Sequence, residues 1–299
     1  MKKIGITLIG GIILLLASQC SPGNPDTAEN AASPGSGEER LNVIVLLDLS
    51  NRLIKTPGQI DKDQAVIKEI LTAFERRQKS QAYITSSDKI SVLVAPQPNV
   101  PTGSNDGLVI DMAALNAPNF GDKNATIGLP AFKKEKATFE TALAQLYAEA
   151  SANPHTGADI YTFFCSDFKA NFLNENAQNK VIILTDGYLL FDKAYLSQRP
   201  KCSYMRELDR LRKAKKDWLS VFERKELALC PCPASSFPNT EVIMLETAPM
   251  LRAQSVFEYN IIEHYWKDWF VKMNVDAKVY PHDDLVSNIG GKVSDFLEK

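Results

Sequence analysis

The feature that most constrains this chain is a set of short apolar runs that lack the apolar–polar alternation of a half-exposed strand. The clearest are "NVIVLL" at residues 42–47 and "KVIILT" at residues 180–185. Runs of this kind are typical of strands covered on both faces, as in parallel sheets. Between them, apolar residues recur every three or four positions, which indicates amphipathic helices. Strands that alternate with helices predict an α/β fold: a doubly wound, mostly parallel central sheet with helices on both faces.

Two of the predicted elements depend on weaker signals. Residues 158–173 suit either a strand or a helix, and phenylalanines spaced by three or four residues favour the helix. Asp283 or Asp284 is expected to cap the last helix. The predicted strands are 42–47, 89–95, 107–112, 180–185, 240–246 and 277–280, of which the second and third are expected to pair, and the predicted helices are 60–79, 138–150, 158–173, 204–229, 255–273 and 284–297.

The first residues have the pattern of an export signal. Lys2 and Lys3 precede a mostly apolar run, which is short for a membrane-spanning helix and ends just before Cys20. A cysteine in this place resembles the lipobox of bacterial lipoproteins, in which the cysteine is lipidated and becomes the first residue of the mature protein. We therefore expect a signal peptide at residues 1–19. The alternative is an uncleaved anchor with an incidental cysteine.

The residues after Cys20 predict a tether followed by one domain. Residues 21–39 are rich in Ser, Gly, Pro, Asn and Glu and contain no large apolar residue, so residues 20–40 are expected to form a lipidated, flexible linker. Residues 41–299 are long enough for one large domain. The net charge of −2, without a basic stripe, argues against nucleic-acid binding. Ser21 resembles the pattern of lipoproteins sent to an outer membrane, although a Gram-positive membrane is the alternative.

Three short segments in residues 41–299 carry a family resemblance. They are Asp48-Leu49-Ser50 after the first strand, Thr138 in "ATFETAL", and Thr185-Asp186-Gly187 after "KVIIL". Together they resemble the von Willebrand factor A (vWA) family, whose corresponding residues form a metal-ion-dependent adhesion site at the top of the sheet. The resemblance implies a vWA-like domain enlarged by an insertion at residues 188–239.

The resemblance also implies a hard divalent ion, Mg²⁺ with Mn²⁺ or Ca²⁺ as alternatives. Ser50 and Thr138 would supply neutral oxygens, while Asp48 and Asp186 would hold coordinating waters and balance the charge. A metal with few direct anionic ligands retains affinity for a carboxylate of another protein. The family's site therefore implies recognition of an acidic residue on a protein partner.

Arg52 departs from the family's D-x-S-x-S motif, because it stands where the second serine is expected. Two outcomes compete. Arg52 turns outward and leaves a weakened metal site, or it takes the place of the metal and neutralises Asp48 and Asp186, so that no cofactor is needed. A third interpretation gives Asp48 and Asp186 only the ordinary role of polar residues at strand ends.

The insertion carries most of the cysteines. Besides Cys20, the chain contains four, and an even number in an exported protein indicates disulfides, for which Cys202, Cys230 and Cys232 are the candidates. A bridge across the predicted helix at residues 204–229 requires that helix to be broken. Cys165 suits a small buried hydrophobe or a partner equally. Zinc binding by Cys202, Cys230 and Cys232, or a redox role for the last two, are the remaining alternatives.

These observations favour a membrane-anchored, protein-binding domain of the bacterial envelope, with an adhesion or scaffold role and no enzymatic activity. The chain contains no Gly-rich nucleotide loop and no Gly-x-Ser-x-Gly motif. We expect the membrane to be contacted only through the N-terminal lipid, and the outer membrane is the expected location. One alternative is a metal-assisted hydrolase that uses the same carboxylates. Another is a structural envelope component whose top-face site is vestigial. The sequence leaves the oligomeric state open.

Overall fold

The computed structural model describes residues 39–97, 104–117, 126–153, 155–191, 193–233, 236–249, 256–282 and 285–298, with side chains omitted at 104–106. The predicted signal peptide, Cys20 and most of the linker lie outside the described residues, as do Asp283 and Asp284. Glu39–Lys299 forms one compact unit. No helix among the described residues is both long and apolar enough to cross a membrane.

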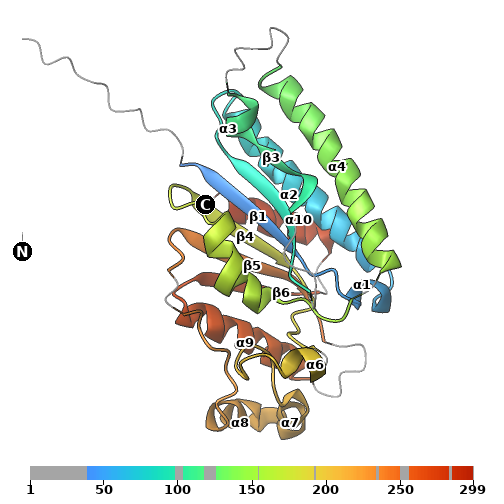
Figure 1. Ribbon diagram of the computed structural model, residues 1–299, viewed down its shortest axis with the longest axis vertical. Coiled ribbons are helices and arrows are strands. Elements are labelled where there is room, and N and C mark those ends of the chain that lie inside the picture. The colour runs from blue at the N-terminus through green and yellow to red at the C-terminus, as the bar shows by residue number, and fades with distance from the viewer. Residues whose placement is uncertain are drawn as a thin grey trace, which may run out of the picture. The chain divides into compact units, whose positions relative to one another are not determined.

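A six-stranded sheet forms the centre of this unit, in the order β3-β2-β1-β4-β5-β6 (Figure 1). All neighbouring strands are parallel except β3, which runs antiparallel to β2. The prediction of a doubly wound, mostly parallel α/β fold is confirmed, and the sheet is consistent with a vWA- or Rossmann-like architecture. The strands are β1 (Leu41–Leu47), β2 (Lys89–Val94), β3 (Ser104–Asp111), β4 (Gln178–Leu184), β5 (Thr240–Thr247) and β6 (Asp276–Pro281).

The apolar run of β1 is buried along its whole length because both faces of the strand are covered. Val43, Val45 and Leu47 point into one hydrophobic cluster, and Ile44 and Leu46 point into the other. This is the environment that an uninterrupted apolar run predicts for a central parallel strand. We call the end of the sheet at which β1, β4 and β5 finish the carboxyl edge, and the end at which β1 and β2 begin the amino edge.

The helices form a layer on each face of the sheet. The cluster that contains Val43 is completed by α2 (Gln59–Ser80), α4 (Leu129–Ala152) and α10 (Val286–Leu297), and the other by the aromatic residues of η1 (Phe163–Phe172) and α9 (Glu258–Lys272). Residues 158–173 are helical as favoured, although η1 is a π-helix that follows a single turn, α5 (Ile160–Thr162). Two further single turns, α1 (Arg52–Lys55) and α3 (Met112–Leu115), follow β1 and β3.

The single long helix predicted at residues 204–229 is wrong. The insertion contains four short helices, and Lys215 adopts a positive φ of 51° where α7 ends. A chain that turns here cannot continue as one rod, so the amphipathic pattern is divided between two helices that pack on the domain. The four are α6 (Lys193–Leu196), α7 (Leu208–Ala214), η2 (Lys215–Asp217) and α8 (Trp218–Arg224).

The break brings the ends of the predicted helix together and permits two disulfides. Cys202 pairs with Cys230, and Cys165 of η1 pairs with Cys232. The expectation of disulfides is confirmed, and Cys165 is a bridging residue instead of a free buried thiol. Because all four sulfurs are used, the zinc alternative for these cysteines has no available thiolate in this state.

Candidate functional site

The ends of β1 and β4 bring two predicted site segments together at the carboxyl edge. Leu47 and Leu184 are register partners, and the backbone N–H of Asp48 donates to the Leu184 carbonyl at 2.9 Å. The Thr185 hydroxyl then donates to Asp48 Oδ2 at 2.7 Å. The Ser50 N–H donates to Asp48 Oδ1 at 2.9 Å. Both carboxylate oxygens of Asp48 therefore hold the local backbone turn and the neighbouring strand end.

Asp186 lies beside Asp48 in this arrangement. Burial, followed by repulsion from the Asp48 charge, raises the pKa of Asp186 to about 7. Its Oδ1 accepts a hydrogen bond from the Tyr188 N–H at 3.1 Å, and its carbonyl accepts one from Ala248 of the loop after β5. Asp186 is therefore a buried carboxyl group that releases its proton near neutral pH.

Thr138 does not join this group. It lies in the middle of α4, exposed, and its hydroxyl donates to the Lys134 carbonyl one turn earlier. The predicted helix start was wrong because the helix begins at Leu129. Tyr147, whose hydroxyl reaches the network below the carboxyl edge, is nine residues further on, which corresponds to about 13 Å along a helix. The residue that lies against Ser50 is His155, whose carbonyl accepts from the Asn51 N–H at 2.7 Å.

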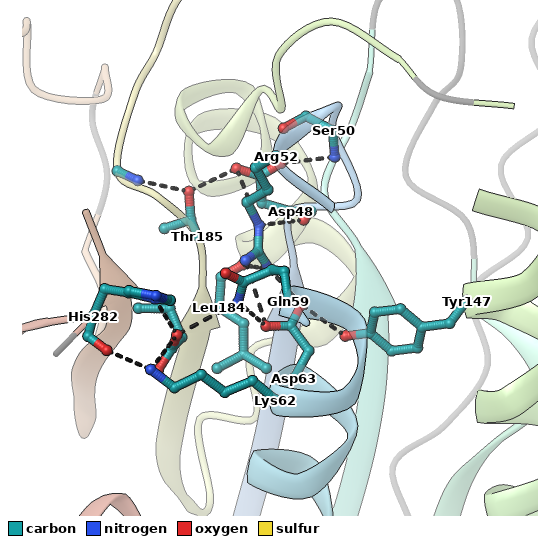
Figure 2. A network of polar contacts seen from close by, with 12 residues as sticks. Asp48, Ser50, Arg52, Gln59, Lys62, Asp63, Tyr147, Leu184, Thr185 and His282 are labelled. Carbon is teal, nitrogen blue, oxygen red and sulfur yellow. Dashed lines mark hydrogen bonds and ion pairs between the residues drawn. The ribbon is translucent and has the colours of Figure 1, made fainter. Parts of the chain in front are cut away.

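Arg52 turns into the protein and does not point outward. Its side chain runs from α1 past Asp48 toward α2, as Figure 2 shows. The guanidinium Nε donates to the Asp48 backbone carbonyl at 2.8 Å and lies 4.0 Å from Asp48 Oδ2. Its main partner is Asp63 of α2, with Nη2 and Oδ2 2.6 Å apart. Arg52 therefore borders the Asp48–Asp186 pair from beneath while its charge is balanced by a third carboxylate.

Asp63 is the site residue that the sequence analysis missed. It is fully buried and also accepts from Gln59 Nε2 at 2.8 Å and from the Tyr147 hydroxyl at 3.1 Å (Figure 2). Burial alone would lower the pKa of Arg52, but Asp63 and then Asp48 raise it above its ordinary value. The available signal was spacing, because Asp63 lies on the same helical face as Val66, Ile67 and Ile70 of α2.

A second cluster continues the network toward β6. Glu246, near the end of β5, is buried, and its Oε2 accepts from Lys62 Nζ at 2.9 Å and contacts His282 Nδ1 at 2.6 Å. Gln59 Nε2 lies 3.4 Å from the same oxygen and so joins Glu246 to Asp63 (Figure 2). Burial would raise the pKa of Glu246, but the hydrogen bonds from His282 and Lys62 leave it lowered. These contacts tie β5 and β6 to α2 beneath the carboxyl edge.

The insertion is anchored beside the same edge. The Tyr188 hydroxyl donates to Glu258 at the start of α9, and Arg212 of α7 binds the same Glu258 oxygen at 2.5 Å. Arg199 forms an ion pair with Asp159, the residue before α5. The insertion therefore borders the carboxyl edge, and its ion pairs hold it there.

In the turn α1, Arg52 and Leu53 are buried, whereas Ile54 and Lys55 are exposed. Arg52 is 4% exposed, whereas Ile54 is 55% exposed and Lys55 beside it is exposed. The inward Arg52 fixes the turn from below, so Ile54 is presented at the carboxyl edge by a rigid support. Single exposed apolar residues are ordinary on protein surfaces, but one beside a buried polar network at a sheet's carboxyl edge marks a candidate contact.

The residues of the predicted metal site fit a divalent ion poorly. Asp48, Ser50 and Asp186 are close together, but the hydroxyl of Thr138 is elsewhere, and the Arg52 cation lies 4.0 Å from an Asp48 oxygen. A hard cation prefers several oxygen ligands, and a permanent positive charge beside them opposes its binding.

Comparisons with known proteins add little to this geometry. No protein-family model and no curated protein matches the chain. Proximal thread matrix protein 1 of the mussel byssus is 12% identical with a TM-score of 0.39, covering 87% of this chain and 47% of that one. An aerotolerance-related membrane protein of Bacteroides fragilis is 11% identical with a TM-score of 0.39, covering 86% and 98%. The pilus adhesin SpaC of Lactobacillus rhamnosus GG is 9% identical with a TM-score of 0.43, covering 88% and 31%.

This chain therefore spans about half of the mussel protein and about a third of the adhesin. Likenesses this distant carry no argument about activity or partners. The fold assignment rests on the strand order and directions of the sheet, and function must be argued from the residues at the carboxyl edge.

Proposed function

We propose that this protein is a lipid-anchored, vWA-like binding domain of the bacterial envelope that recognises another protein at the carboxyl edge of its sheet. In this proposal the buried Arg52 network supports the recognition surface without a metal ion. The role is adhesion or scaffolding, and no reaction is assigned to it.

The observation that carries the proposal is the reversed exposure of Arg52 and Ile54. Burying an arginine with its carboxylate partner removes both charges from water, which is costly, and exposing an isoleucine forgoes its burial. A partner that covers Ile54 would recover the apolar burial, and interface energy is typically concentrated in such residues.

The chemistry of the exposed residues suggests the kind of partner. Ile54 offers an apolar contact and Lys55 an adjacent positive charge, so the matching surface would combine an apolar pocket with a carboxylate. An acidic partner is what the family resemblance implies for a metal-containing site. Here Lys55 would replace the metal as the group that attracts the acidic residue.

Site-specific photo-crosslinking in the producing bacterium tests the binding proposal. A photoreactive phenylalanine analogue at position 54 should yield a discrete crosslinked product, and Lys55→Glu in the same chain should reduce its yield. A matched analogue at Leu219 of α8, which is 39% exposed on the insertion, should not yield this product. Equal labelling from both positions, or none from position 54, would overturn the assignment of the carboxyl edge.

Membrane anchoring is tested separately with Cys20→Ser. Metabolic labelling with a radioactive fatty acid should modify the wild-type chain and not the variant. The variant should also leave the membrane fraction or remain unprocessed. A variant that is labelled like the wild type would exclude Cys20 as the lipid site.

A further inference from the structure

We propose that Ile84, Ile127 and Leu129 form a membrane-contacting patch at the amino edge of the sheet, resting on the lipid surface to which Cys20 anchors the chain. We call these three residues the amino-edge patch. The inference rests on the proposed lipid anchor but not on the proposed partner site. It assigns the domain an orientation.

The amino-edge patch is a cluster of large, exposed apolar side chains. Ile84 is 57% exposed, Ile127 is 50% exposed and Leu129 is 38% exposed. Ile84 lies against the backbone between the other two, because a Cβ on Gly128 would lie 2.7 Å from Ile84 Cγ2. Isolated exposed apolar residues need no explanation, but a contiguous group marks an interaction surface.

Asn116 holds the two segments of the patch together. Its Nδ2 donates to the carbonyls of Tyr83 at 2.7 Å and Ser86 at 3.2 Å, on either side of Ile84. Its Oδ1 accepts from the Gly128 N–H at 3.2 Å. One amide side chain therefore fixes the turn that carries Ile84 against the start of α4.

The backbone before Ile84 directs this side chain outward at a cost. Ala82 and Tyr83 have positive φ angles of 50° and 61°, a conformation that non-glycine residues rarely adopt. The Tyr83 ring remains inside and packs against Phe132, with centroids 5.4 Å apart. The surrounding structure therefore holds a strained turn in which Tyr83 is buried and Ile84 is exposed. Strain maintained in this way favours a functional role for the exposed side chain.

The chain enters the domain at this same edge. Glu39 is the first described residue, and its carbonyl accepts from Arg77 Nη2 at 2.8 Å, in the last turn of the helix that leads to Ile84. The Leu41 N–H donates to Asp88 Oδ1 at 2.8 Å, four residues after Ile84. In Figure 1, α3 and the start of α4 lie at the end of the sheet opposite α1.

The predicted tether is short enough to keep the patch near the bilayer. The tether predicted from the sequence has 18 residues between Cys20 and Glu39, and a flexible linker of that length would have a root-mean-square span of about 23 Å. A surface held this close to lipid experiences a high effective concentration of it. Weak apolar contacts that would not hold a free protein on a membrane can then orient an anchored one.

The charges next to the patch also suit a lipid surface. Lys133 and Lys134, one turn into α4, are exposed, and no ion pair is recorded for either within the described residues. Lysines beside exposed isoleucines and leucines can reach anionic headgroups while the apolar side chains enter the acyl boundary. The carboxyl edge of the sheet would then face away from the membrane. The seven residues of β1 separate the two edges by about 20 Å.

Fluorescence quenching in vesicles tests the orientation with the full lipidated chain. Ile84→Trp, and independently Ile127→Trp, place a probe in the patch. Val256→Trp is the control, because Val256 is 88% exposed and precedes α9 at the carboxyl edge. Each variant is reconstituted into phosphatidylethanolamine–phosphatidylglycerol vesicles with and without brominated acyl chains. The wild-type emission, from three native tryptophans, is subtracted.

The probe at position 84 or 127 should lose emission about twofold in brominated vesicles, whereas the probe at position 256 should be unchanged. Loss at all three positions, or at none, would overturn the orientation. Blue-shifted emission from positions 84 and 127 before vesicles are added would show that another part of the chain covers the patch, which also overturns it. Flotation separates the two proposals: a chain that does not float with vesicles refutes the anchor, whereas a floating chain without selective quenching refutes only the patch.

Discussion

Arg52 of α1 and Asp63 of α2 form a buried ion pair, with Nη2 and Oδ2 2.6 Å apart and both side chains almost completely shielded from solvent. The pair joins the turn after β1 to the helix beneath the carboxyl edge. Because Arg52 also donates to the Asp48 carbonyl, the same contact positions the backbone that carries Ser50 and Ile54. The strength of the pair therefore determines how rigidly the proposed recognition turn is held.

Asp63→Ala should destabilise the fold by about 3–5 kcal/mol, because it leaves a guanidinium buried without its partner. Urea unfolding of the purified chain measures the loss. Glu298→Ala is the matched control, since it removes a carboxylate from the Arg76–Glu298 pair, in which both side chains are about 60% exposed. That change should cost less than about 1 kcal/mol. Similar losses in the two variants would show that the buried pair has no special role.

Removing divalent ions should leave the wild-type melting temperature unchanged. A ligand that binds only the folded state raises this temperature with its concentration, so EDTA and millimolar Mg²⁺ or Mn²⁺ should give coincident curves. Arg52→Ser restores the family's hydroxyl and removes the cation, and metal should then stabilise the variant measurably. Asp48→Ala in the Arg52→Ser background should abolish that gain. A metal-dependent shift in the wild type that Asp48→Ala removes would instead support a resident ion.

Asp186→Asn should become less destabilising, and then stabilising, relative to wild type as the pH rises. Burial and Asp48 raise the pKa of Asp186 from 3.8 to about 7, so folding favours its protonated form. This contribution is fully present below about pH 4 and is lost as the pH rises through 7, because in that range the unfolded state has released the proton that the folded state still holds. The difference in unfolding free energy between variant and wild type should shift by about 2–4 kcal/mol between those limits.

Unfolding of the Asp186→Asn variant in urea across that pH range checks the sign. Asp209→Asn is the control, because the Asp209 side chain is 85% exposed on the insertion. A flat difference for Asp186→Asn would mean that folding does not raise the pKa of Asp186.

Replacing Cys202 and Cys230 together by alanine should destabilise the chain by about 3–4 kcal/mol. The reason is that the disulfide restricts the unfolded chain, and its removal restores that conformational entropy. The bridge closes 28 residues of sequence separation, and the Cys230 carbonyl also accepts from Trp269 Nε1 at 2.8 Å. Hydrogen exchange should therefore show the loss first in residues 203–229. Uniform loosening of the whole sheet, with residues 203–229 no faster, would contradict this assignment.

Local periodicity in the sequence was sufficient for the sheet and its covering helices. The uninterrupted apolar runs of β1 and β4 require burial on two faces, and the spacing of three to four in α2 and α9 requires one buried stripe. The proximity of Asp48 to Asp186 followed as well, because parallel neighbours end at the same edge. These properties depend on residues that are close in the sequence, or on a rule that holds for every parallel sheet.

The errors arose where an outcome depended on contacts between distant segments. Thr138 was expected to begin a helix, yet α4 begins at Leu129, and Phe132 in the added turns packs against Phe74 and Tyr83. The amphipathic pattern at 204–229 does not reveal that the chain turns at Lys215 so that Cys202 can meet Cys230. Cys165 and Cys232 are 67 residues apart, and no local pattern pairs them.

The sequence by itself determined the α/β class, the strand-end carboxylates and the anomaly of an arginine after Asp48 and Ser50. Only the tertiary structure decided what that arginine does. Its direction depends on Asp63, buried eleven residues later, and Tyr147 and Leu184 complete the same pocket from two further elements. A buried cation goes where its charge and its donors can be satisfied together, and that place exists only after the sheet and its helices have assembled.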